Sequence, residues 1–257
     1  TMASATYTAR AIVLRKTKLG ESDLIVTLLA QDGSQVRAVA KGARKPSSPF
    51  AARLELYSSV DLLCSEGRSL DIVKEARIAS SHERLRRDLE HAACAAPMAE
   101  LLDRVTQEGL ANPRLFALTE AALDALDGAL APQAPAVCAA HLLKALAFSG
   151  LRPSLSSCAV CGADVPGGAD AGTVPLSFCE GGVVCPACRP SVEAQGVPAA
   201  TVAWCRALMG STFAEIAELD VPPSASFAVL RFCQQWAHEH VGANLKSLNF
   251  LFTCGLF

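Results

Sequence analysis

Residues 8–48 read TARAIVLRKTKLGESDLIVTLLAQDGSQVRAVAKGARKPSS and contain three short stretches with the pattern of β-strands. Residues 8–16 alternate between apolar and polar side chains. An apolar run at Leu24–Leu29 stops at the turn residues Gln31–Ser34, and Val36–Lys41 follows. Because alternation with period two, bounded by turn residues, is typical of strands, this stretch predicts three strands of an N-terminal β-domain.

Two further strands are predicted before residue 80. Leu54–Leu62 places apolar side chains in alternation with polar ones, and Leu70–Ile78 follows a turn at Ser65–Arg68. Five strands in about 75 residues is the size of an OB-fold, a Greek-key barrel that often holds single-stranded nucleic acid. An SH3-like barrel fits the same pattern almost as well.

The period becomes helical from about Ser80 onwards. Asn112-Pro113 predicts a helix start, since proline is favoured at the first helical position, and apolar side chains recur on one face from there to Leu126. Three more helices are predicted, and glycine follows two of them. We therefore expect an α+β protein with an OB-fold at 1–80, a helical domain at 81–257 and a cysteine-bearing segment inserted at 155–190. The three helices are expected at Ala136–Ser149 before Gly150, at Pro198–Leu208, and at Pro223–Val241 before Gly242.

The charge of the chain is unevenly distributed. The formal net charge is −2, but residues 1–78 hold 12 Lys/Arg against 8 Asp/Glu, and residues 79–257 hold 11 against 17. A basic part joined to an acidic remainder suggests a polyanionic partner for the first part. The first residues lack the pattern of a secretory signal, and no run of about 18 uncharged apolar residues occurs. We expect a cytoplasmic protein with reduced cysteines.

Four of the eleven cysteines form two C-x-x-C pairs, Cys158/Cys161 and Cys185/Cys188. Each such turn directs two thiolates at one point, and two turns complete a tetrahedron, which is the pattern of a zinc ribbon or knuckle. Four cysteine ligands leave no position for a water molecule. The pattern therefore predicts one structural Zn²⁺, with buried thiols or a redox pair as the alternative.

The other seven cysteines are scattered singly. Cys179 lies near the second pair in the sequence and is an alternative ligand. The remaining six stand in apolar contexts and are expected to pack in the core. These six are Cys64, Cys94, Cys138, Cys205, Cys233 and Cys254.

Catalytic motifs are missing from the sequence. There is no G-x-x-x-x-G-K-[ST], no G-x-G-x-x-G and no H-E-x-x-H. A metal-dependent hydrolase would need an open metal position that four cysteines do not provide. The sequence therefore predicts a binding protein and not an enzyme.

Basic residues gather in the predicted barrel. Arg37 and Lys41 share one strand face, and Gly42–Pro46 forms a basic loop. Such charges either are a solvated face or follow the phosphates of a nucleic acid. The phosphate-binding interpretation names eight candidate DNA contacts. They are Arg10, Arg15, Lys16, Lys18, Arg37, Lys41, Arg44 and Lys45.

The stretch 8–48 resembles the N-terminal signature of the RecO family of bacterial recombination mediators, in which a pattern of the form "aiVL……ge.d.i…lT…G….vakGar" recurs. The order barrel, helices, four cysteines, helices is similar to the family, as is the ending HVGANLKSLNFL. The resemblance covers nearly the whole chain. Because the C-terminal part is acidic and rich in alanine, the sequence does not predict a second DNA surface there.

The resemblance implies an N-terminal OB-fold, a helical domain, and binding to single- and double-stranded DNA. It implies two partners, RecR and the C-terminal tail of single-stranded-DNA-binding protein (SSB). It also implies strand annealing and help in loading RecA onto SSB-coated DNA, without a nucleotide cofactor. By position, the best DNA contacts are Arg37, Lys41, Arg44 and Lys45.

Two hypotheses remain at this level. The acidic SSB tail is expected on the helical domain, where a basic side chain lies beside an apolar face; the candidates are Arg104, Arg114, Lys144, Arg206 and Arg231. The alternative function is a zinc-ribbon adaptor of the transcription machinery whose barrel binds protein.

Overall fold

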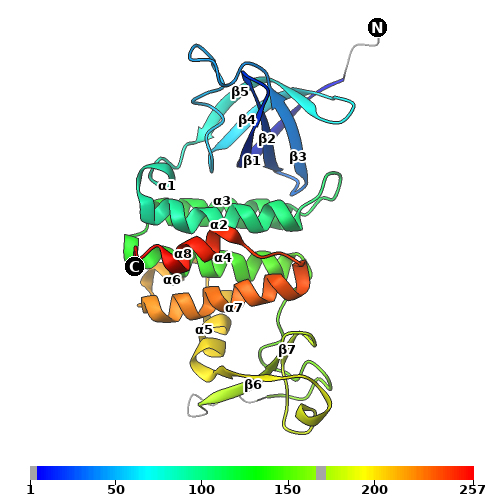
Figure 1. The fold of residues 1–257 in the computed structure, drawn as a ribbon, viewed down its shortest axis with the longest axis vertical. Coiled ribbons are helices and arrows are strands. Elements are labelled where there is room, and N and C mark those ends of the chain that lie inside the picture. Colours follow the sequence, from blue (N-terminus) through cyan, green and yellow to red (C-terminus); the bar gives the residue numbers. More distant parts are fainter. Residues whose placement is uncertain (1–4, 166–171) are drawn as a thin grey trace. The chain divides into compact units, whose positions relative to one another are not determined.

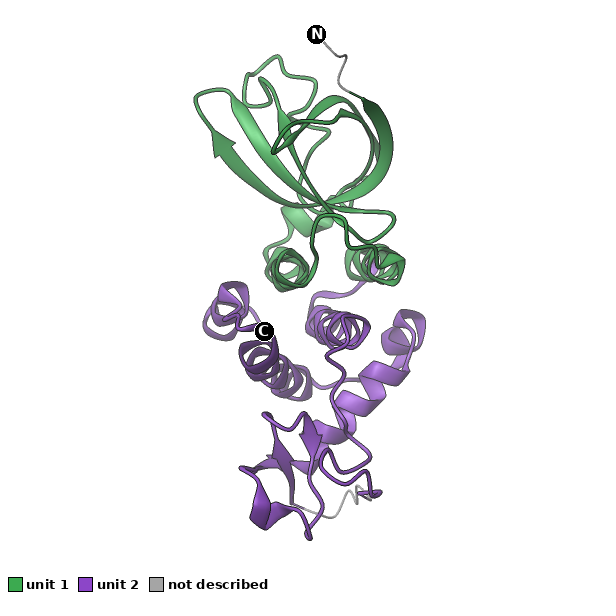
Figure 2. Ribbon diagram, turned by 90° about the vertical axis from the view of Figure 1, so that its right-hand side faces the viewer, with its two compact units in different colours: residues 1–127 green, residues 128–257 purple. Residues whose placement is uncertain are grey.

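The structure is a computed structural model that describes residues 5–165 and 172–257. The chain divides into two compact units, which we call the N-terminal unit (residues 1–127) and the C-terminal unit (residues 128–257), coloured separately in Figure 2. Within the described residues, no helix combines the length and the hydrophobicity needed to cross a membrane.

The N-terminal unit begins with a closed five-stranded barrel of order β1-β2-β3-β5-β4, as predicted for an OB-fold (Figure 1). All neighbouring strands are antiparallel except β3 and β5, which pair in parallel only at Ala38/Asp71 and Val39/Ile72. The bounds are β1 Thr6–Leu19, β2 Asp23–Ala30, β3 Gln35–Ala40, β4 Ser59–Ser65 and β5 Asp71–Ser80.

The first strand closes the barrel because it pairs with β4 through its first half and with β2 through its second half. A register shift between Val13 and Arg15 interrupts the ladder with β2, and such a bulge bends a strand. Alternate side chains point inward and form a core that includes Val13, Val26 and Leu28. The apolar residues of the period-two pattern in the sequence therefore line the inside of this barrel.

The fourth strand begins at Ser59 and not at Leu54, which corrects the sequence-based prediction. Leu54 is only 1% exposed, because the β3–β4 loop turns inward and packs its apolar side chains in the barrel core. Tyr57 has φ of +67°, a left-handed conformation that an extended strand does not contain. The apolar side chains that this loop packs in the core therefore produced the same apolar–polar alternation as a strand.

Three helices complete the N-terminal unit: α1 Arg84–Arg87, α2 Leu89–Val105 and α3 Pro113–Gly128. Figures 1 and 2 show α2 and α3 side by side across one end of the barrel. The β2–β3 turn touches the loop between them, since a Cβ at Gly33 would lie 1.8 Å from the carbonyl oxygen of Asn112. The barrel is thus joined closely to its helices, with Gln35 N also donating to Gln107 O at 3.0 Å.

The C-terminal unit is a group of helices with a small three-stranded sheet of order β7-β6-β8. Helix α4 has a buried side chain at most of its positions, so it forms the centre of the group. Helix α7 ends at Val241 before Gly242, whose φ is +67°, as predicted. The helices are α4 Ala134–Phe148, α5 Ala199–Gly210, α6 Phe213–Glu218, α7 Pro223–Val241 and α8 Lys246–Thr253; the strands are β6 Thr173–Ser177, β7 Gly182–Val183 and β8 Gln195–Pro198.

Candidate metal centre and nucleic-acid interface

Two tight turns carry the four cysteines. In the first, Gly162 N donates to Cys158 O at 2.9 Å, and Cys158 N donates to Ala163 O at 2.7 Å. In the second, the backbone N–H groups of Cys188 and Arg189 donate to Cys185 O at 3.1 and 3.0 Å. Each turn brings the sulfurs of its two cysteines close to each other.

Strand β7 brings the two turns together. Ala159 N donates to Val183 O at 2.8 Å, which ties the first turn to the strand that leads into the second. The approach requires glycine at position 182, because a Cβ there would lie 2.1 Å from the carbonyl oxygen of Ser154. The backbone contacts around β7 therefore place the two cysteine turns next to each other.

The four sulfurs of Cys158, Cys161, Cys185 and Cys188 all lie within 4.8 Å of one another. The Sγ atoms of Cys161 and Cys185 are 3.7 Å apart. Sulfurs bound at roughly 2.3 Å to a tetrahedral metal ion are separated by about 3.8 Å, so this spacing fits such an ion. The donor set and its geometry can hold one metal ion with no position left for water.

Backbone dipoles favour negative charge at this cluster. The N–H group of Cys185 donates to Cys158 Sγ at 3.4 Å, and with that of Cys161 it lowers the pKa of Cys158 to about 6. Hydrogen bonds with the sulfurs of Cys185 and Cys161 raise the pKa of Cys188 to about 12. The N–H groups thus favour the thiolate form of Cys158, whereas hydrogen bonds with neighbouring sulfurs favour the thiol form of Cys188. A divalent cation between the four sulfurs would favour the thiolate form of each.

The other cysteines lie as the sequence suggested, with one partial exception. Cys179 is exposed and does not belong to the sulfur cluster found among the described residues. Five of the six scattered cysteines are buried, whereas Cys254 is half-buried. The buried ones are Cys64, Cys94, Cys138, Cys205 and Cys233.

Three of the eight predicted DNA contacts form ion pairs inside the N-terminal unit. Arg10 makes a two-pronged contact with Asp61, with Nε–Oδ1 of 2.8 Å and Nη2–Oδ2 of 3.2 Å. Arg15 Nε lies 3.3 Å from Asp103 Oδ2, and Lys16 Nζ lies 2.9 Å from Glu55 Oε2. Because the partners are far apart in the sequence, residue spacing could not predict these pairs.

Four of the eight gather at one end of the barrel, and we call them the basic tip: Lys18, Lys41, Arg44 and Lys45. The β1–β2 turn and the start of the β3–β4 loop meet there. Arg44 N donates to Ser22 O at 2.8 Å, and Arg44 Nη1 donates to Gly20 O at 3.0 Å. Among the described residues, no ion pair is recorded for these four side chains, and all four are exposed.

Asp23 organises the basic tip. Its Oδ1 accepts from Gly42 N at 2.7 Å and from Ser22 Oγ at 3.0 Å. The Gly42 N–H, then the Ser22 hydroxyl, and then the nearby charges of Lys41 and Lys45 lower the pKa of Asp23. A carboxylate held in this way fixes the loop while leaving the ammonium groups in solvent.

Arg37 differs from the side chains of the basic tip. It lies within β3 opposite Thr27 and is half-buried. Its Nε is enclosed and has no hydrogen-bond partner in the part of the chain that the structure describes. Lys41 follows the end of the strand and is exposed. The two residues predicted to share one DNA-binding face therefore have different environments.

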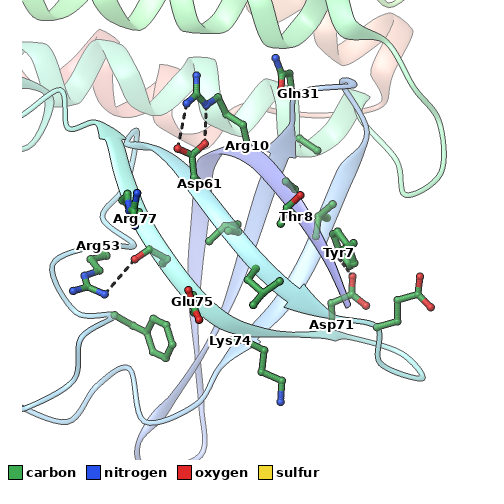
Figure 3. A pocket seen from close by; sticks show the side chains of 18 of the residues that line it. Tyr7, Thr8, Arg10, Gln31, Arg53, Asp61, Asp71, Lys74, Glu75 and Arg77 are labelled. Carbon is green, nitrogen blue, oxygen red and sulfur yellow. Dashed lines mark hydrogen bonds and ion pairs between the residues drawn. The ribbon is translucent and has the colours of Figure 1, made fainter. Parts of the chain in front are cut away.

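A groove of about 1770 Å³ runs along β1, β4 and β5, a feature that sequence patterns did not indicate (Figure 3). Its charged lining residues are of both signs. The carboxylates are Asp32, Asp61, Glu66, Asp71 and Glu75, and the cations are Arg10, Arg53, Lys74 and Arg77. Tyr7, Phe50 and Ile78 add apolar surface.

Comparison with known proteins shows the family. The family model described as "Recombination protein O N terminal" matches residues 2–82, and "Recombination protein O C terminal" matches residues 86–249. This chain belongs to the RecO family.

Three RecO relatives, each named DNA repair protein RecO, illustrate the similarity. That of Frankia casuarinae is 44% identical over 72% of this chain and 74% of the relative, and that of Bifidobacterium longum subsp. infantis is 40% identical over 70% and 73%. That of Roseiflexus sp. (strain RS-1) is 34% identical over 97% and 86%. The RecO assignment favours the DNA-repair interpretation over the transcription adaptor.

Proposed function

We propose that this RecO-family chain binds single- and double-stranded DNA through the basic tip and anneals complementary strands without a nucleotide cofactor or catalysis. The proposal rests on a cluster of exposed cations that form no ion pair with any described residue, on a barrel of the OB type. Bringing two polyanions together costs electrostatic energy. A basic surface that neutralises phosphates of both strands lowers this cost and reads no bases.

The eight candidate contacts have unequal roles in this proposal. Lys18, Lys41, Arg44 and Lys45 contact phosphates directly. Arg10, Arg15 and Lys16 contribute less, because each already faces a carboxylate. Arg37 flanks the site with its half-buried side chain.

We propose that residues 1–80 form the DNA-binding domain and residues 81–257 a helical domain. Residues 155–190 are the metal-binding segment inserted in the helical domain. With RecR as partner, the protein would promote RecA loading on SSB-coated DNA, in the cytoplasm at the nucleoid. Membership in a family of DNA repair proteins supports this role.

The acidic SSB tail is proposed to dock at a hollow of about 400 Å³ on α7 and α8. Of the candidate cations in the C-terminal unit, Lys144 donates to Met209 O and Arg206 to Leu155 O, so both serve the fold. Arg231 lines the hollow, with its guanidinium carbon 4.4 Å from the ring centre of Phe252. A cation stacked on an aromatic ring suits a peptide that is both acidic and hydrophobic. Arg104 and Arg114 belong to the N-terminal unit.

A tail peptide tests this site. Arg231→Glu should lower the affinity of a fluorescent SSB-tail peptide at least tenfold, whereas Arg189→Glu, a charge reversal on the same unit but outside the hollow, should not. Equal affinity for both variants would place the tail elsewhere.

The metal is proposed to be one structural Zn²⁺, since four thiolates in a closed tetrahedral set suit zinc. Cys161→Ser should abolish stoichiometric zinc and lower the thermal stability of the C-terminal unit. The loss should be smaller than the roughly 10 kcal/mol of isolated zinc fingers, because a helical core also holds this segment. Cys179→Ser is the matched control and should keep its zinc. Elemental analysis without zinc, together with four free thiols at the cluster, would contradict the proposal.

A strand-annealing assay with and without SSB tests the function itself. The protein should accelerate annealing of both naked and SSB-coated complementary strands without ATP. A Lys41→Glu/Lys45→Glu variant that folds, keeps its zinc and anneals at the normal rate would show that the basic tip is not the DNA site.

A further inference from the structure

The groove on β1, β4 and β5 contains an open strand edge. Strand β5 pairs with β4 along its length, but its other edge pairs with β3 only at Asp71 and Ile72. From Val73 onwards, no backbone partner is recorded on that side among the described residues. An unpaired edge is a row of donors and acceptors on which another extended chain can be added.

The open edge faces the groove. The carbonyl of Ala76 accepts a hydrogen bond from Arg53 Nη1 at 3.3 Å, and Arg53 belongs to the β3–β4 loop that lines the groove. Between Glu75 and Ile78 the ladder with β4 is regular, so the backbone of Ile78, two residues from Ala76, points the same way. Ile78 is 39% exposed, which gives the edge an apolar contact as well.

The charges of the groove disfavour a polyanion. Five carboxylates line it against four cations. Arg10 is matched by Asp61, and Arg53 is directed to Ala76 O. Lys74 and Arg77 then stand against Asp32, Asp71 and Glu75, so phosphates would meet net repulsion.

We propose that this groove docks an extended segment of a protein partner, with basic and apolar side chains in alternation, which adds to the open edge of β5. Backbone hydrogen bonds from the N–H of Ala76, whose carbonyl already accepts from Arg53, and with Ile78 supply the register. The apolar side chains of the segment meet Phe50 and Ile78. The basic side chains meet Glu75 and its neighbouring carboxylates. The docked segment is protein and not DNA, and it does not contact the basic tip.

Three probes test the groove by backbone NMR of the full chain. They are an eight-residue capped peptide of alternating Lys and Val, a matched peptide of alternating Glu and Val, and an oligothymidylate of eight nucleotides. The Lys/Val peptide should shift the amide signals of Lys74, Arg77 and Ile78, and the other two probes should not. Shifts there caused by the oligothymidylate would make the groove a DNA site and overturn the proposal.

Two charge reversals separate docking from general attraction. Glu75→Lys, in the groove, should weaken the Lys/Val peptide about fivefold, the upper range for one exposed charge pair. Glu108→Lys reverses an exposed carboxylate outside both the groove and the basic tip, and should change the affinity less than twofold. Equal effects of the two variants would show non-specific attraction and refute the docking site. Neither residue belongs to the basic tip. The outcome of this experiment is therefore independent of whether the basic tip binds DNA.

Discussion

The basic tip and the groove lie on the same barrel and both carry several Lys or Arg side chains, yet their electrostatics differ. At the tip, four exposed cations stand against two carboxylates, Glu21 in the β1–β2 turn and Asp23 at the start of β2. Asp23 already accepts a hydrogen bond from the backbone of Gly42. In the groove, carboxylates outnumber cations. The count of basic residues in a domain therefore does not locate a surface for a polyanion. We propose that the cations without carboxylate partners among the described residues mark it, which favours the tip.

The largest expected effect comes from reversing charges at the tip. Lys41→Glu/Lys45→Glu should weaken single-stranded DNA about 25-fold at 0.1 M salt, because each lost phosphate contact forfeits roughly 0.7 log units of affinity under those conditions. Lys74→Glu/Arg77→Glu in the groove should change affinity less than threefold. Fluorescence anisotropy with an oligothymidylate measures both. A larger loss in the groove variant would reverse the comparison.

The choice of variants follows from the structure. Arg37→Glu would place a carboxylate where the Nε of arginine is enclosed, so a loss of binding could reflect a loss of folding. Arg86 is equally unsuitable as a distant control, since its Nη1 donates to Leu56 O and holds the β3–β4 loop to α1. Arg87, exposed and paired with Glu83, is the matched control outside the barrel. Thermal melts should show the tip variant as stable as Arg87→Glu.

The salt dependence of DNA affinity should also differ between the tip variant and the groove variant. If the four cations of the tip each neutralise one phosphate, the logarithm of affinity should fall with the logarithm of salt at a slope of about −3. The tip variant should show a slope of about −1.4, and the groove variant the slope of the unaltered protein. Titrations at several salt concentrations measure this. A slope that is unchanged in the tip variant would mean that Lys41 and Lys45 contact no phosphates.

The smallest expected change in DNA affinity comes from removing the carboxylate partner of a cation. Asp61→Asn removes the carboxylate that matches Arg10 and so adds one uncompensated positive charge to the barrel. DNA affinity should rise about twofold at low salt and not at high salt, because exposed charges are screened. Anisotropy at two salt concentrations checks this. A fall in affinity would show that Asp61 supports the DNA site.

The sequence predicted the elements well where local physics decides them. The start of α3 at Pro113 and the end of α7 before Gly242 follow from proline and glycine chemistry, and both are confirmed. The fourth strand was placed too early, because Leu54 is buried in a loop. Burial by tertiary packing produces the same alternation as a strand, and sequence alone cannot separate the two.

The two parts of the candidate site differ in the same way. The four cysteines carry their own spacing, and the structure brings them together. The pairing of Arg15 with Asp103 depends on where α2 lies against the barrel. The sequence alone could therefore not predict that Arg15 has a carboxylate partner. The open edge of β5 likewise depends on the barrel closing at only two residue pairs.

A backbone NMR titration of the full chain with an eight-nucleotide oligothymidylate shows directly which surface of the barrel binds DNA. The amide signals of Lys18 and of residues 41–45 should shift, and those of residues 74–78 should stay in place. Shifts confined to residues 74–78, with the tip unaffected, would contradict the proposal that the basic tip binds DNA.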